Sequence, residues 1–365
     1  MPSLGEAGPR HKPGTPPTGA GTPLLLESDP MTTSQIPLPS GFGPASTTTD
    51  VLTGIDLTGR LAVVTGGGSG IGVETVRALG GAGADVIVPA RDTARAAGAL
   101  AGIPRVDLRP LDLTDPDSIE AFTASVLADD RPVDILVNSA GIMAAPLERD
   151  ARGYESHFAT NHLGHFQLTA GLWPLLVRGG GARVVAVSSW GHRQSDIIWD
   201  DPNFTRTDYT PMLGYGQSKT ANVLHAVELD RRGREHGVRA FALHPGSILT
   251  RLARHTAPEA LVGMGVLDEQ GNPVLDPSRN LKTPEQGAAT SVWCATSPQL
   301  AGLGGVYCEN ADIAPLSTAE RDAATLTVGS FAQGVLPYAI DPASARRLWA
   351  LSAELTGIDL PEAGR

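Results

Sequence analysis

Continuous runs of Val, Ile and Leu recur along the chain from Arg60 onward, and stretches with helical spacing lie between them. Uninterrupted apolar runs indicate strands that are covered on both faces, as in a parallel sheet. The runs predict strands in RLAVVT, ADVIVPA, VDLRPLDL, VDILVNSAG, ARVVAVSS, GVRAFALHPG and GGVYCEN. Helices are expected from Gly70 to Leu79 and near 116–128, 154–177, 212–236 and 284–296. This alternation predicts an α/β fold with a doubly wound parallel sheet, the Rossmann arrangement.

The first 50 residues fall outside this alternation. They hold ten of the 29 prolines, mixed with Gly, Thr and Ser, and such a segment cannot bury enough apolar area to offset the entropy of ordering. We therefore predict a disordered leader over residues 1–50, with Met31 as an alternative start, followed by one domain over 51–365. A long insertion near 252–283 belongs to that domain.

Composition and charge narrow the class of function. The formal net charge is −11 and the sequence pI is about 5.3, so the surface repels nucleic-acid phosphates and anionic lipids. No apolar run approaches the ~18 residues of a membrane span, and no signal segment is recognisable. These features predict a cytoplasmic protein with no nucleic-acid or membrane partner. Cys294 and Cys308 lack disulfide-framework or metal-ligand spacing, and we expect both to be buried.

The segment VVTGGGSGIG (residues 63–72) joins the first predicted strand to the first predicted helix. Glycines at such a junction let the backbone approach a pyrophosphate, whose charge is stabilised at the helix N-terminus. The spacing differs from G-x-G-x-x-G, and a P-loop is excluded because no Lys-Ser/Thr pair follows the glycines. The segment therefore indicates a dinucleotide site, with a merely flexible loop as the alternative.

The segment LGYGQSKTAN places Tyr215 and Lys219 on one face of a predicted helix. Such pairs are common on helices. Combined with the motif Thr65-Gly66-x-x-x-Gly70-x-Gly72, however, this pair makes the chain resemble the short-chain dehydrogenase/reductase family. The match runs from about Phe42 to the C-terminal ARRLWALSAELTG. It is most similar to the retinol-dehydrogenase-like branch, which includes the oxidoreductase domain of WW-domain-containing oxidoreductase. The closer match is carried by NHLGHF, LHPGSILT, QGAATSVWCAT and LAGLGGVYCEN.

The resemblance implies an enzyme that interconverts an alcohol and a carbonyl on a fairly apolar small molecule. Tyr215 would exchange the proton, and Lys219 would also bind the nicotinamide ribose. The Lys219 ammonium and the positive charge of the oxidised nicotinamide would together lower the pKa of Tyr215 from ~10. Ser189 would hold the substrate oxygen, with Ser188 as a strand-end hydroxyl. Asn161 would seat a water that relays protons. Relatives often form homodimers through the helices that carry Tyr215 and Asn161, so a homodimer is possible here.

The resemblance also implies the cofactor contacts, position by position. Asp112 matches the acid that accepts a hydrogen bond from the adenine amino group, and Asn138 and Ala140 lie in a turn that forms the cofactor floor. The positions in the glycine segment are Thr65, Gly66, Ser69, Gly70, Ile71 and Gly72. The segment that holds the nicotinamide carboxamide supplies Pro245, Gly246 and Thr250.

The end of the second strand bears on the choice of cofactor. NAD-specific relatives carry an acidic residue there that bonds the ribose 2′-hydroxyl, whereas this chain has Ala90 followed by Arg91. An Arg can pair with a 2′-phosphate through two hydrogen bonds. NADP(H) is therefore favoured over NAD(H), which stays possible because Arg91 could simply be a solvated residue at a helix start.

Two loops are expected near the substrate. The first, residues 190–213, reflects an insertion that leaves 25 residues between Ser189 and Tyr215. Its aromatic residues either line an apolar pocket or pack the loop down; they are Trp190, Trp199, Phe204 and Tyr209. Tyr209 has no Lys four residues later in the sequence, so it is not a candidate for the catalytic tyrosine. The second loop, 252–283, is expected beside the nicotinamide with a turn at Gly271-Asn272.

Three nearby histidines invite a metal site, but no carboxylate or Cys completes a ligand set, so none is predicted. We expect His157, His162 and His165 to pack or hydrogen-bond within their helix. Asp200 and Asp201 are expected to be solvated loop charges. Two rival functions stay open: a non-catalytic NADP(H)-binding regulatory or scaffold protein, and a sugar-nucleotide epimerase or dehydratase of the same fold.

Overall fold

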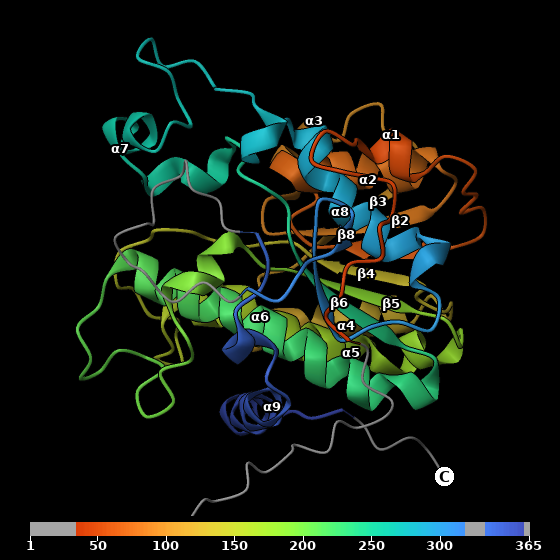
Figure 1. The fold of residues 1–365 in the computed structure, drawn as a ribbon. Helices are drawn as coiled ribbons and strands as arrows, with labels where there is room; N and C mark the ends of the chain where they lie inside the picture. Colours follow the sequence, from red (N-terminus) through yellow and green to blue (C-terminus); the bar gives the residue numbers. More distant parts are fainter. Residues whose placement is uncertain (1–33, 318–332, 361–365) are drawn as a thin grey trace, which may run out of the picture. The chain divides into compact units, whose positions relative to one another are not determined.

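The structure, a computed structural model, describes residues 34–317 and 333–360. Its sheet has the strand order β3-β2-β1-β4-β5-β6-β7-β8 (Figure 1). Neighbouring strands from β3 to β7 are parallel, and β8 pairs antiparallel with β7. The strands are β1 Leu61–Val64, β2 Asp85–Ala90, β3 Val106–Pro110, β4 Ile135–Asn138, β5 Arg183–Val187, β6 Arg239–His244, β7 Val306–Glu309 and β8 Asp312–Ile313. The predicted doubly wound parallel sheet is confirmed.

The helices follow the predicted alternation. They are α1 Thr48–Val51, α2 Gly70–Gly81, α3 Thr93–Ala99, α4 Pro116–Leu127, α5 Gly164–Arg178, α6 Pro211–Gly233, α7 Pro258–Gly263, α8 Pro284–Thr296 and α9 Pro342–Thr356. A π-helical turn, η1 (Phe158–Leu163), leads into α5. The short 3-10 turns are η2 Trp190–Gln194, η3 Arg234–His236, η4 Arg251–His255, η5 Pro277–Arg279, η6 Pro298–Leu300 and η8 Pro337–Ile340.

Four of the helices begin with the same local signal, a polar N-cap residue followed by proline. The side chains of Asp115, Thr210, Thr283 and Asp341 each accept a backbone N–H of the first turn of α4, α6, α8 and α9. Proline has no N–H to leave unsatisfied there, and its φ is already helical. The sequence therefore fixes where the long helices start, including α6, which carries Tyr215.

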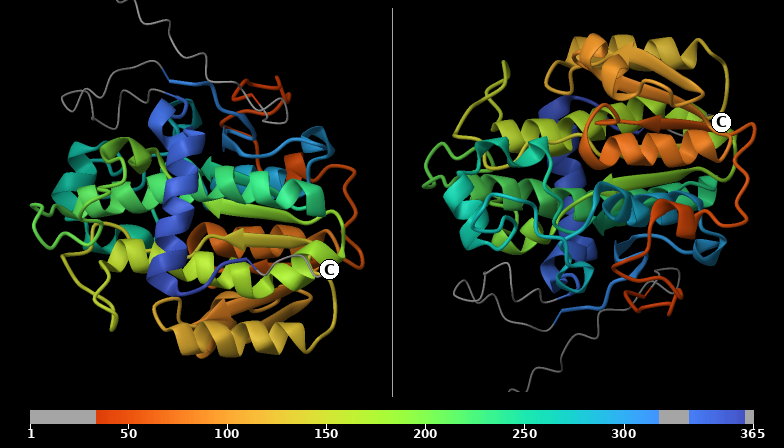
Figure 2. Two further views of the ribbon diagram at one scale, coloured as in Figure 1. Left: turned by 90° about the horizontal axis from the view of Figure 1, so that it is seen from below. Right: turned by 90° about the horizontal axis from the view of Figure 1, so that it is seen from above.

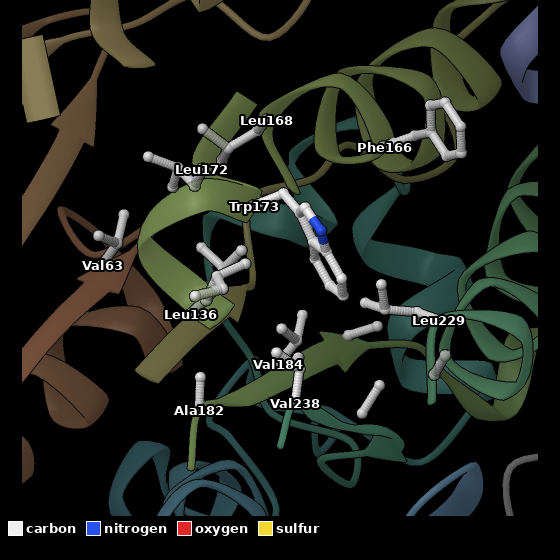
Figure 3. Packing of buried hydrophobic residues seen from close by; sticks show 14 of the residues in the cluster. Val63, Leu136, Phe166, Leu168, Leu172, Trp173, Ala182, Val184, Leu229 and Val238 are labelled. Carbon is white, nitrogen blue, oxygen red and sulfur yellow. The ribbon is translucent and has the colours of Figure 1, made fainter. Parts of the chain in front are cut away.

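Each side of the sheet has its own hydrophobic core, because alternate strand residues face opposite sides. In β1, Leu61 and Val63 pack with residues of α4, α5 and α6, whereas Ala62 and Val64 pack with residues of α2 and α8. Figure 3 shows the first core, where the Trp173 indole lies above strand residues such as Val184. Cys294 and Cys308 are free and buried in the second core, as predicted.

The expected leader is corrected in its second half. Residues 34–50 pack onto the domain in the structure and include helix α1, whereas residues 1–33, and Met31 with them, lie outside the described residues. Proline-rich composition signals a shortage of apolar side chains, but polar contacts hold this segment in addition to the packing of Leu38 and Phe42 on the second core. The structured part of the chain therefore begins before residue 51.

Those contacts lie along strands β7 and β8. The Gln35 amide donates to the carbonyls of Tyr307 (2.7 Å) and Ala314 (2.6 Å), and it accepts from the Tyr307 N–H (2.9 Å). The Asp312 carboxylate accepts from the backbone N–H groups of Leu38 (2.8 Å) and Ser40 (3.1 Å). Residues 34–40 thus cover the end of the sheet where an open strand edge would otherwise attract other chains.

Helix α9 lies across α5 and α6 (Figure 2). The Trp349 indole packs edge-on against Phe166 (4.9 Å between ring centroids) and stacks on His225 (5.5 Å). His162 shares a 2.7 Å hydrogen bond with Ser352. A helix of the same chain therefore covers the side chains of α5 and α6 on the face where pairing between subunits is expected.

The insertion before α6 is built around a buried aspartate. Asp201 accepts hydrogen bonds from the backbone of Thr205, Arg206 and Thr207 and from the Thr205 hydroxyl. Burial acts to raise the pKa of Asp201, but these hydrogen bonds outweigh it and hold the pKa well below its usual value. The expectation of a solvated charge is wrong for Asp201 and holds for Asp200, which is exposed.

The second insertion holds η4, α7 and η5. The predicted turn is present: Gly271 has a φ of 82°, and the Asp268 carboxylate accepts from the Asn272 N–H (2.7 Å). A cavity of about 210 Å³ lies between this insertion and the segment after β6, lined by Ile248, Val266, Val274 and Lys282 among others. In the described part of the chain, no helix combines the length and apolar character needed to cross a membrane.

Candidate functional site

The residues expected to form the site gather at the carboxyl ends of β1, β4, β5 and β6. The strand order reverses between β1 and β4, because β2 and β3 lie on one side of β1 while β5 and β6 lie beyond β4. Such a switch point leaves a crevice outside the strand ends, where open α/β sheets bind ligands. The fold alone therefore places the glycine segment and Tyr215 around one crevice.

The glycine segment follows β1 and turns tightly into α2. Gly66 and Gly70 have φ of 69° and 53°, a region that favours glycine. A Cβ on Gly72 would overlap the carbonyl oxygen of Gly66, and a Cβ on Gly70 would lie 3.0 Å from the Thr250 methyl. The turn therefore needs these glycines, and Thr250 lies directly beside it. Ser69 is the N-cap residue of α2, without a side-chain capping bond, and Ile71 packs in the second core.

Thr65 is buried and ties the ends of β1 and β4 together. Its hydroxyl oxygen accepts from the N–H groups of Ser139 (2.9 Å) and Ala140 (3.0 Å), and it shares a 2.9 Å hydrogen bond with His165 Nε2. His165 also bonds the Asn161 carbonyl through Nδ1 (2.9 Å). Thr65 thus shapes the floor of the crevice from inside the protein, and His165 joins it, a role that the spacing of the sequence does not reveal.

Arg91 and Asp112 mark the far side of the crevice, one after β2 and one after β3. Arg91 is exposed, and its guanidinium makes no hydrogen bond or ion pair within residues 34–317 and 333–360. Asp112 is half-buried and accepts from the Thr114 N–H (2.9 Å) and hydroxyl (2.7 Å). The two charges therefore lie on neighbouring strand ends, at the glycine-loop side of the switch point.

Asn138 ends β4 and anchors the start of the cofactor-floor turn. Its amide donates to the Thr169 hydroxyl (3.2 Å) in α5. The amide oxygen is buried, with no hydrogen-bond partner in the described residues. Asn138 therefore joins the sheet to α5.

The segment after β6 is held by the second insertion. Ser247 exchanges backbone hydrogen bonds with Asn280 (2.8 Å) and Lys282 (3.0 Å). Gly246 has a φ of 104°, and a Cβ there would lie 2.8 Å from the Lys282 side chain. Pro245 precedes this glycine, and Thr250 caps η4. The expected nicotinamide segment is thus a tight turn packed against a buried lysine.

Tyr215 and Lys219 lie one turn apart on α6, and both side chains are buried. The Lys219 ammonium is 5.6 Å from the Tyr215 ring centroid and donates to the Val187 carbonyl (3.0 Å). Burial raises the pKa of Tyr215 to about 12, opposed by a hydrogen bond with Ser189, and burial lowers the pKa of Lys219 to about 8. The lowered phenol pKa expected from the Tyr-Lys spacing is therefore not a property of the protein chain alone.

The two serines at the end of β5 have different surroundings. The Ser188 hydroxyl is buried and donates to the Lys219 carbonyl (2.7 Å). The Ser189 hydroxyl accepts from the Gly191 N–H (3.0 Å) and lies beside Tyr215. Gly191 is required here because a Cβ would lie 2.7 Å from the Tyr215 ring. Of the two, Ser189 is the hydroxyl placed next to the phenol.

Asn161 lies in the π-helical turn η1 and is fully buried. Its amide oxygen accepts from the Ile142 N–H (2.9 Å), and its amide nitrogen donates to the Ile142 carbonyl (3.1 Å) and the Ser218 hydroxyl (2.9 Å). A Cβ on Gly141 would lie 2.9 Å from the Asn161 oxygen and 3.7 Å from the Lys219 ammonium. Asn161 and Lys219 therefore face the same stretch of backbone.

The three histidines form hydrogen bonds, as expected, but the side-chain partners of His162 and His165 lie outside their own helix. His157 pairs with Glu155 (2.7 Å), His162 with Ser352 and His165 with Thr65. Burial lowers the pKa of His165 to about 4 and holds that of His162 well below its usual value. Across the described residues, no three His, Cys, Asp or Glu side chains are grouped so that they could hold a metal ion.

A glycine turn that can receive a pyrophosphate, a buried phenol–ammonium pair and an adjacent serine hydroxyl lie at the carboxyl edge of one sheet. Such a site can bind a dinucleotide and move a proton to or from an oxygen beside it.

Comparison with known proteins gives the same picture. The model of the short chain dehydrogenase family matches residues 60–260. A Streptomyces lividans protein named "Probable oxidoreductase" is 45% identical over 307 residues, which are 82% of this chain and 98% of that protein. Human retinol dehydrogenase 12 is 36% identical over 313 residues, covering 84% of this chain and 89% of its own length.

Solved structures show the same fold. An uncharacterised protein from Mycobacterium paratuberculosis superposes with a TM-score of 0.65 and 32% identity, covering 87% of this chain and 99% of its own. The active-site complex of RhlG with NADP, from Pseudomonas aeruginosa, gives a TM-score of 0.53 and 26% identity, with 69% and 94% of the two chains covered.

Proposed function

Because the chain belongs to the short-chain dehydrogenase/reductase family and is similar to its retinol-dehydrogenase-like branch, we propose that it is an NADP(H)-dependent oxidoreductase. It interconverts an alcohol and a carbonyl on a fairly apolar small molecule, with Tyr215 as the acid or base. The observation that carries the proposal is the burial of Tyr215 and Lys219 beside Ser189, at the strand ends where the glycine turn lies.

The residues around the glycine turn fit a dinucleotide. Gly66, Gly70 and Gly72 leave the turn free of side chains that would block a pyrophosphate. Arg91 is exposed at the end of β2, where a 2′-phosphate could pair with its guanidinium. Asp112 lies at the next strand end, in the place expected for the adenine amino group. When bound, the nicotinamide would supply or accept the hydride and, when oxidised, a positive charge.

Side chains of the protein can supply and accept the proton that the reaction exchanges with the substrate oxygen. A phenol whose pKa is about 12 stays protonated at neutral pH, so in carbonyl reduction Tyr215 would donate its proton to the oxygen that Ser189 holds. In the reverse direction the phenol must lose a proton, which the Lys219 ammonium favours by its charge. The Lys219 ammonium has three N–H donors, and one is used by Val187. The others can serve the ribose and a relay water at Asn161.

A substrate panel tests the function. Oxidation of NADPH and of NADH is followed with aldehydes, ketones and quinones, and Tyr215→Phe is measured beside the unmodified protein. We expect turnover with NADPH and a loss of ~10²-fold or more in Tyr215→Phe, at unchanged cofactor affinity. Near-normal activity of the variant would remove Tyr215 from its role.

The same panel addresses the first rival function. Tight NADPH binding with no turnover of any substrate would favour the regulatory or scaffold protein. That alternative is disfavoured because non-catalytic relatives commonly lose the Tyr or the Lys, whereas this chain keeps Tyr215 and Lys219 along with Ser189 and Asn161. A separate assay is needed for the third function: conversion of a nucleotide sugar, followed by product analysis and with no net oxidation of NADPH, would identify an epimerase or dehydratase.

We also propose that the chain is a monomer, because α9 covers α5 and α6, the helices through which relatives often pair. Trp349 and Ser352 of α9 pack against the very side chains that a partner subunit would contact. Light scattering coupled to size-exclusion chromatography tests this, with a monomer mass expected and a dimer mass contradicting it.

A further inference from the structure

The backbone that follows β4 runs past Thr65 and Asn161, and side chains hold it at three places. Thr65 fixes its first part through the N–H groups of Ser139 and Ala140. Asn161 fixes the middle through both polar groups of Ile142. The third attachment is at Ala145, where none of the proposed catalytic residues takes part. We call residues 139–145 the crossing segment.

The third attachment consists of a histidine and a tyrosine. His157 Nε2 accepts from the Ala145 N–H (3.3 Å), and the Tyr209 hydroxyl donates to the Ala145 carbonyl (2.8 Å). Both polar groups of Ala145 are thus used, as those of Ile142 are by Asn161. Tyr209 comes from the insertion before α6, so the insertion reaches across to the crossing segment.

A buried carboxylate orients the histidine of this pair. Glu155 is fully buried and lies 2.7 Å from His157 Nδ1, which therefore carries the proton and leaves Nε2 to accept. Glu155 also accepts from the N–H of Phe158 (2.8 Å) at the start of η1, and one of its oxygens lies 3.4 Å from the Tyr209 oxygen, whose single proton is donated to Ala145. One carboxylate thus fixes the histidine tautomer and the turn that carries Asn161, and it lies beside the tyrosine.

This network touches the proposed catalytic tyrosine. The His157 ring meets the Tyr215 ring edge-on, with 6.0 Å between centroids. A Cβ on Gly214, the residue before Tyr215, would lie 2.8 Å from the Tyr209 ring and 3.2 Å from Glu155. The Tyr215 ring therefore contacts His157, and the residue before Tyr215 packs against Tyr209 and Glu155.

The end of the crossing segment is strained and partly open to solvent. Ala144 has a φ of 54°, which costs a residue with a Cβ about 1–2 kcal/mol. Such backbone persists where its surroundings fix it and is common at ligand sites. Ile142, Met143 and Ala144 are half-buried, whereas Ala145 is buried. The apolar side chains of the segment can thus meet a ligand while its end stays anchored.

We propose that Glu155, His157 and Tyr209 are positioning residues that hold Ile142–Ala145 as the wall against which the apolar part of the substrate packs beside Tyr215. This inference rests on the proposed function. The wall contacts a part of the substrate that does not react, so it contributes equally to the ground state and the transition state. Loosening it therefore raises KM and leaves kcat nearly unchanged.

The test compares two Tyr→Phe substitutions, each of which removes one hydroxyl group and the hydrogen bond that it donates to a backbone carbonyl. Tyr209→Phe removes the hydrogen bond to Ala145, and Tyr154→Phe removes a 2.7 Å hydrogen bond to the Leu355 carbonyl, at the end of α9. With the best apolar substrate of the panel, we expect KM to rise on the order of fivefold in Tyr209→Phe. The KM of Tyr154→Phe, and kcat and NADPH affinity in both variants, should stay within about twofold.

Equal KM values in the two variants would overturn the inference. So would a parallel loss of NADPH affinity in Tyr209→Phe, because a general structural defect would reach the glycine turn as well. The proposed function fails in a different way, namely when the unmodified protein turns over nothing on the panel.

Two substitutions of His157 separate its two contacts. His157→Gln keeps an acceptor near the Ala145 N–H, and His157→Asn keeps a donor near Glu155 but cannot reach Ala145. We expect His157→Asn to raise KM at least as much as Tyr209→Phe, and His157→Gln to raise it less. The opposite order would show that the contact of His157 with Glu155 alone affects KM. It would contradict the proposal that His157 holds Ile142–Ala145 as a wall for the substrate.

Discussion

The two sides of the crevice are built by different means. On the β1–α2 side, the backbone itself forms the site. Gly66, Gly70 and Gly72 are required there because side chains would come too close to neighbouring residues of the same chain. On the β5–α6 side, buried polar side chains form it, with Tyr215, Lys219 and Glu155 all almost inaccessible to solvent. The first side depends on the absence of side chains at its glycines, and the second depends on polar groups that are costly to bury.

This difference decides what substitutions do. A site made of backbone fails by steric overlap, which affects folding and binding together. A site made of buried polar groups lowers the free energy of unfolding, because these groups lose their contact with water, and this loss is present whether or not the enzyme turns over. The β5–α6 side should therefore yield variants that are more stable and less active, and the β1–α2 side should not.

The largest effect is expected from Gly72→Ala. The added methyl would meet the Gly66 carbonyl group, which is backbone and cannot move aside. We expect a loss of about 3 kcal/mol or more in unfolding free energy, together with loss of NADPH binding. Thermal unfolding and NADPH titration measure both. Gly81→Ala, in the same helix with nothing within 4 Å, is the control and should behave as the unmodified protein.

Lys219→Met should instead stabilise the protein while abolishing turnover. Burial lowers the pKa of Lys219 from 10.5 to about 8, so the unfolded chain holds this proton at pH values where the folded chain has lost it. Wild-type stability is therefore reduced below pH 8 and recovers as pH rises toward 10.5. We expect the variant to be more stable by about 2 kcal/mol at pH 7, after allowing for the lost bond to Val187.

Urea unfolding across pH checks this prediction. The advantage of Lys219→Met over the unmodified protein should shrink between pH 8 and pH 10.5. The Val187 carbonyl keeps a second donor, the Asn222 amide (3.1 Å), so the substitution leaves no orphaned acceptor. A variant that is less stable at pH 7 would contradict the contrast between the two sides.

Arg91→Ala sharpens the contrast within the β1–α2 side. Removal of a guanidinium that pairs with a 2′-phosphate should raise KM for NADPH roughly tenfold and leave KM for NADH unchanged. Arg95→Ala is the matched control, because Arg95 is exposed one turn along and already faces Asp92 (3.9 Å). Equal effects of Arg91→Ala on the two cofactors would remove the preference for NADP(H).

The smallest effect is expected at Ala144. Replacement by glycine relieves the positive φ but increases the freedom of the unfolded chain, and these changes nearly cancel. Ala144→Gly should therefore be more stable by less than about 1 kcal/mol. Ala145→Gly, whose backbone is not in that region, should lose stability. Melting temperatures of the two variants would settle the comparison, and a loss in Ala144→Gly would show that the backbone there is unstrained.

The fold was predictable because its signals are local. Continuous apolar runs mark buried strands, and polar-Pro pairs such as Thr210-Pro211 mark helix starts. The glycine turn was predictable for the same reason, since a strand, five glycines and a helix stand next to each other. The Tyr215–Lys219 pair needed the family resemblance, because the spacing by itself is common.

The contacts that escaped prediction join positions far apart in the sequence. Thr65 meets His165 and Tyr209 meets Ala145 only after the sheet has formed. Asp201 has no neighbour in the sequence that signals its burial, and its partners are backbone N–H groups that any residue could supply. Polar networks of this kind have no periodicity, so pattern analysis passes over them.

The hydrogen bonds between Gln35 and Tyr307 join residues that are 272 positions apart in the sequence. During synthesis, which runs from the N-terminus, β7 and β8 leave the ribosome when nearly the whole domain is already exposed. The first described residues must therefore wait for β7 and β8, and their docking reports that these two strands are in place. A nascent chain arrested before Asp312 would carry this segment free and open to proteolysis, whereas release of the full chain would protect it.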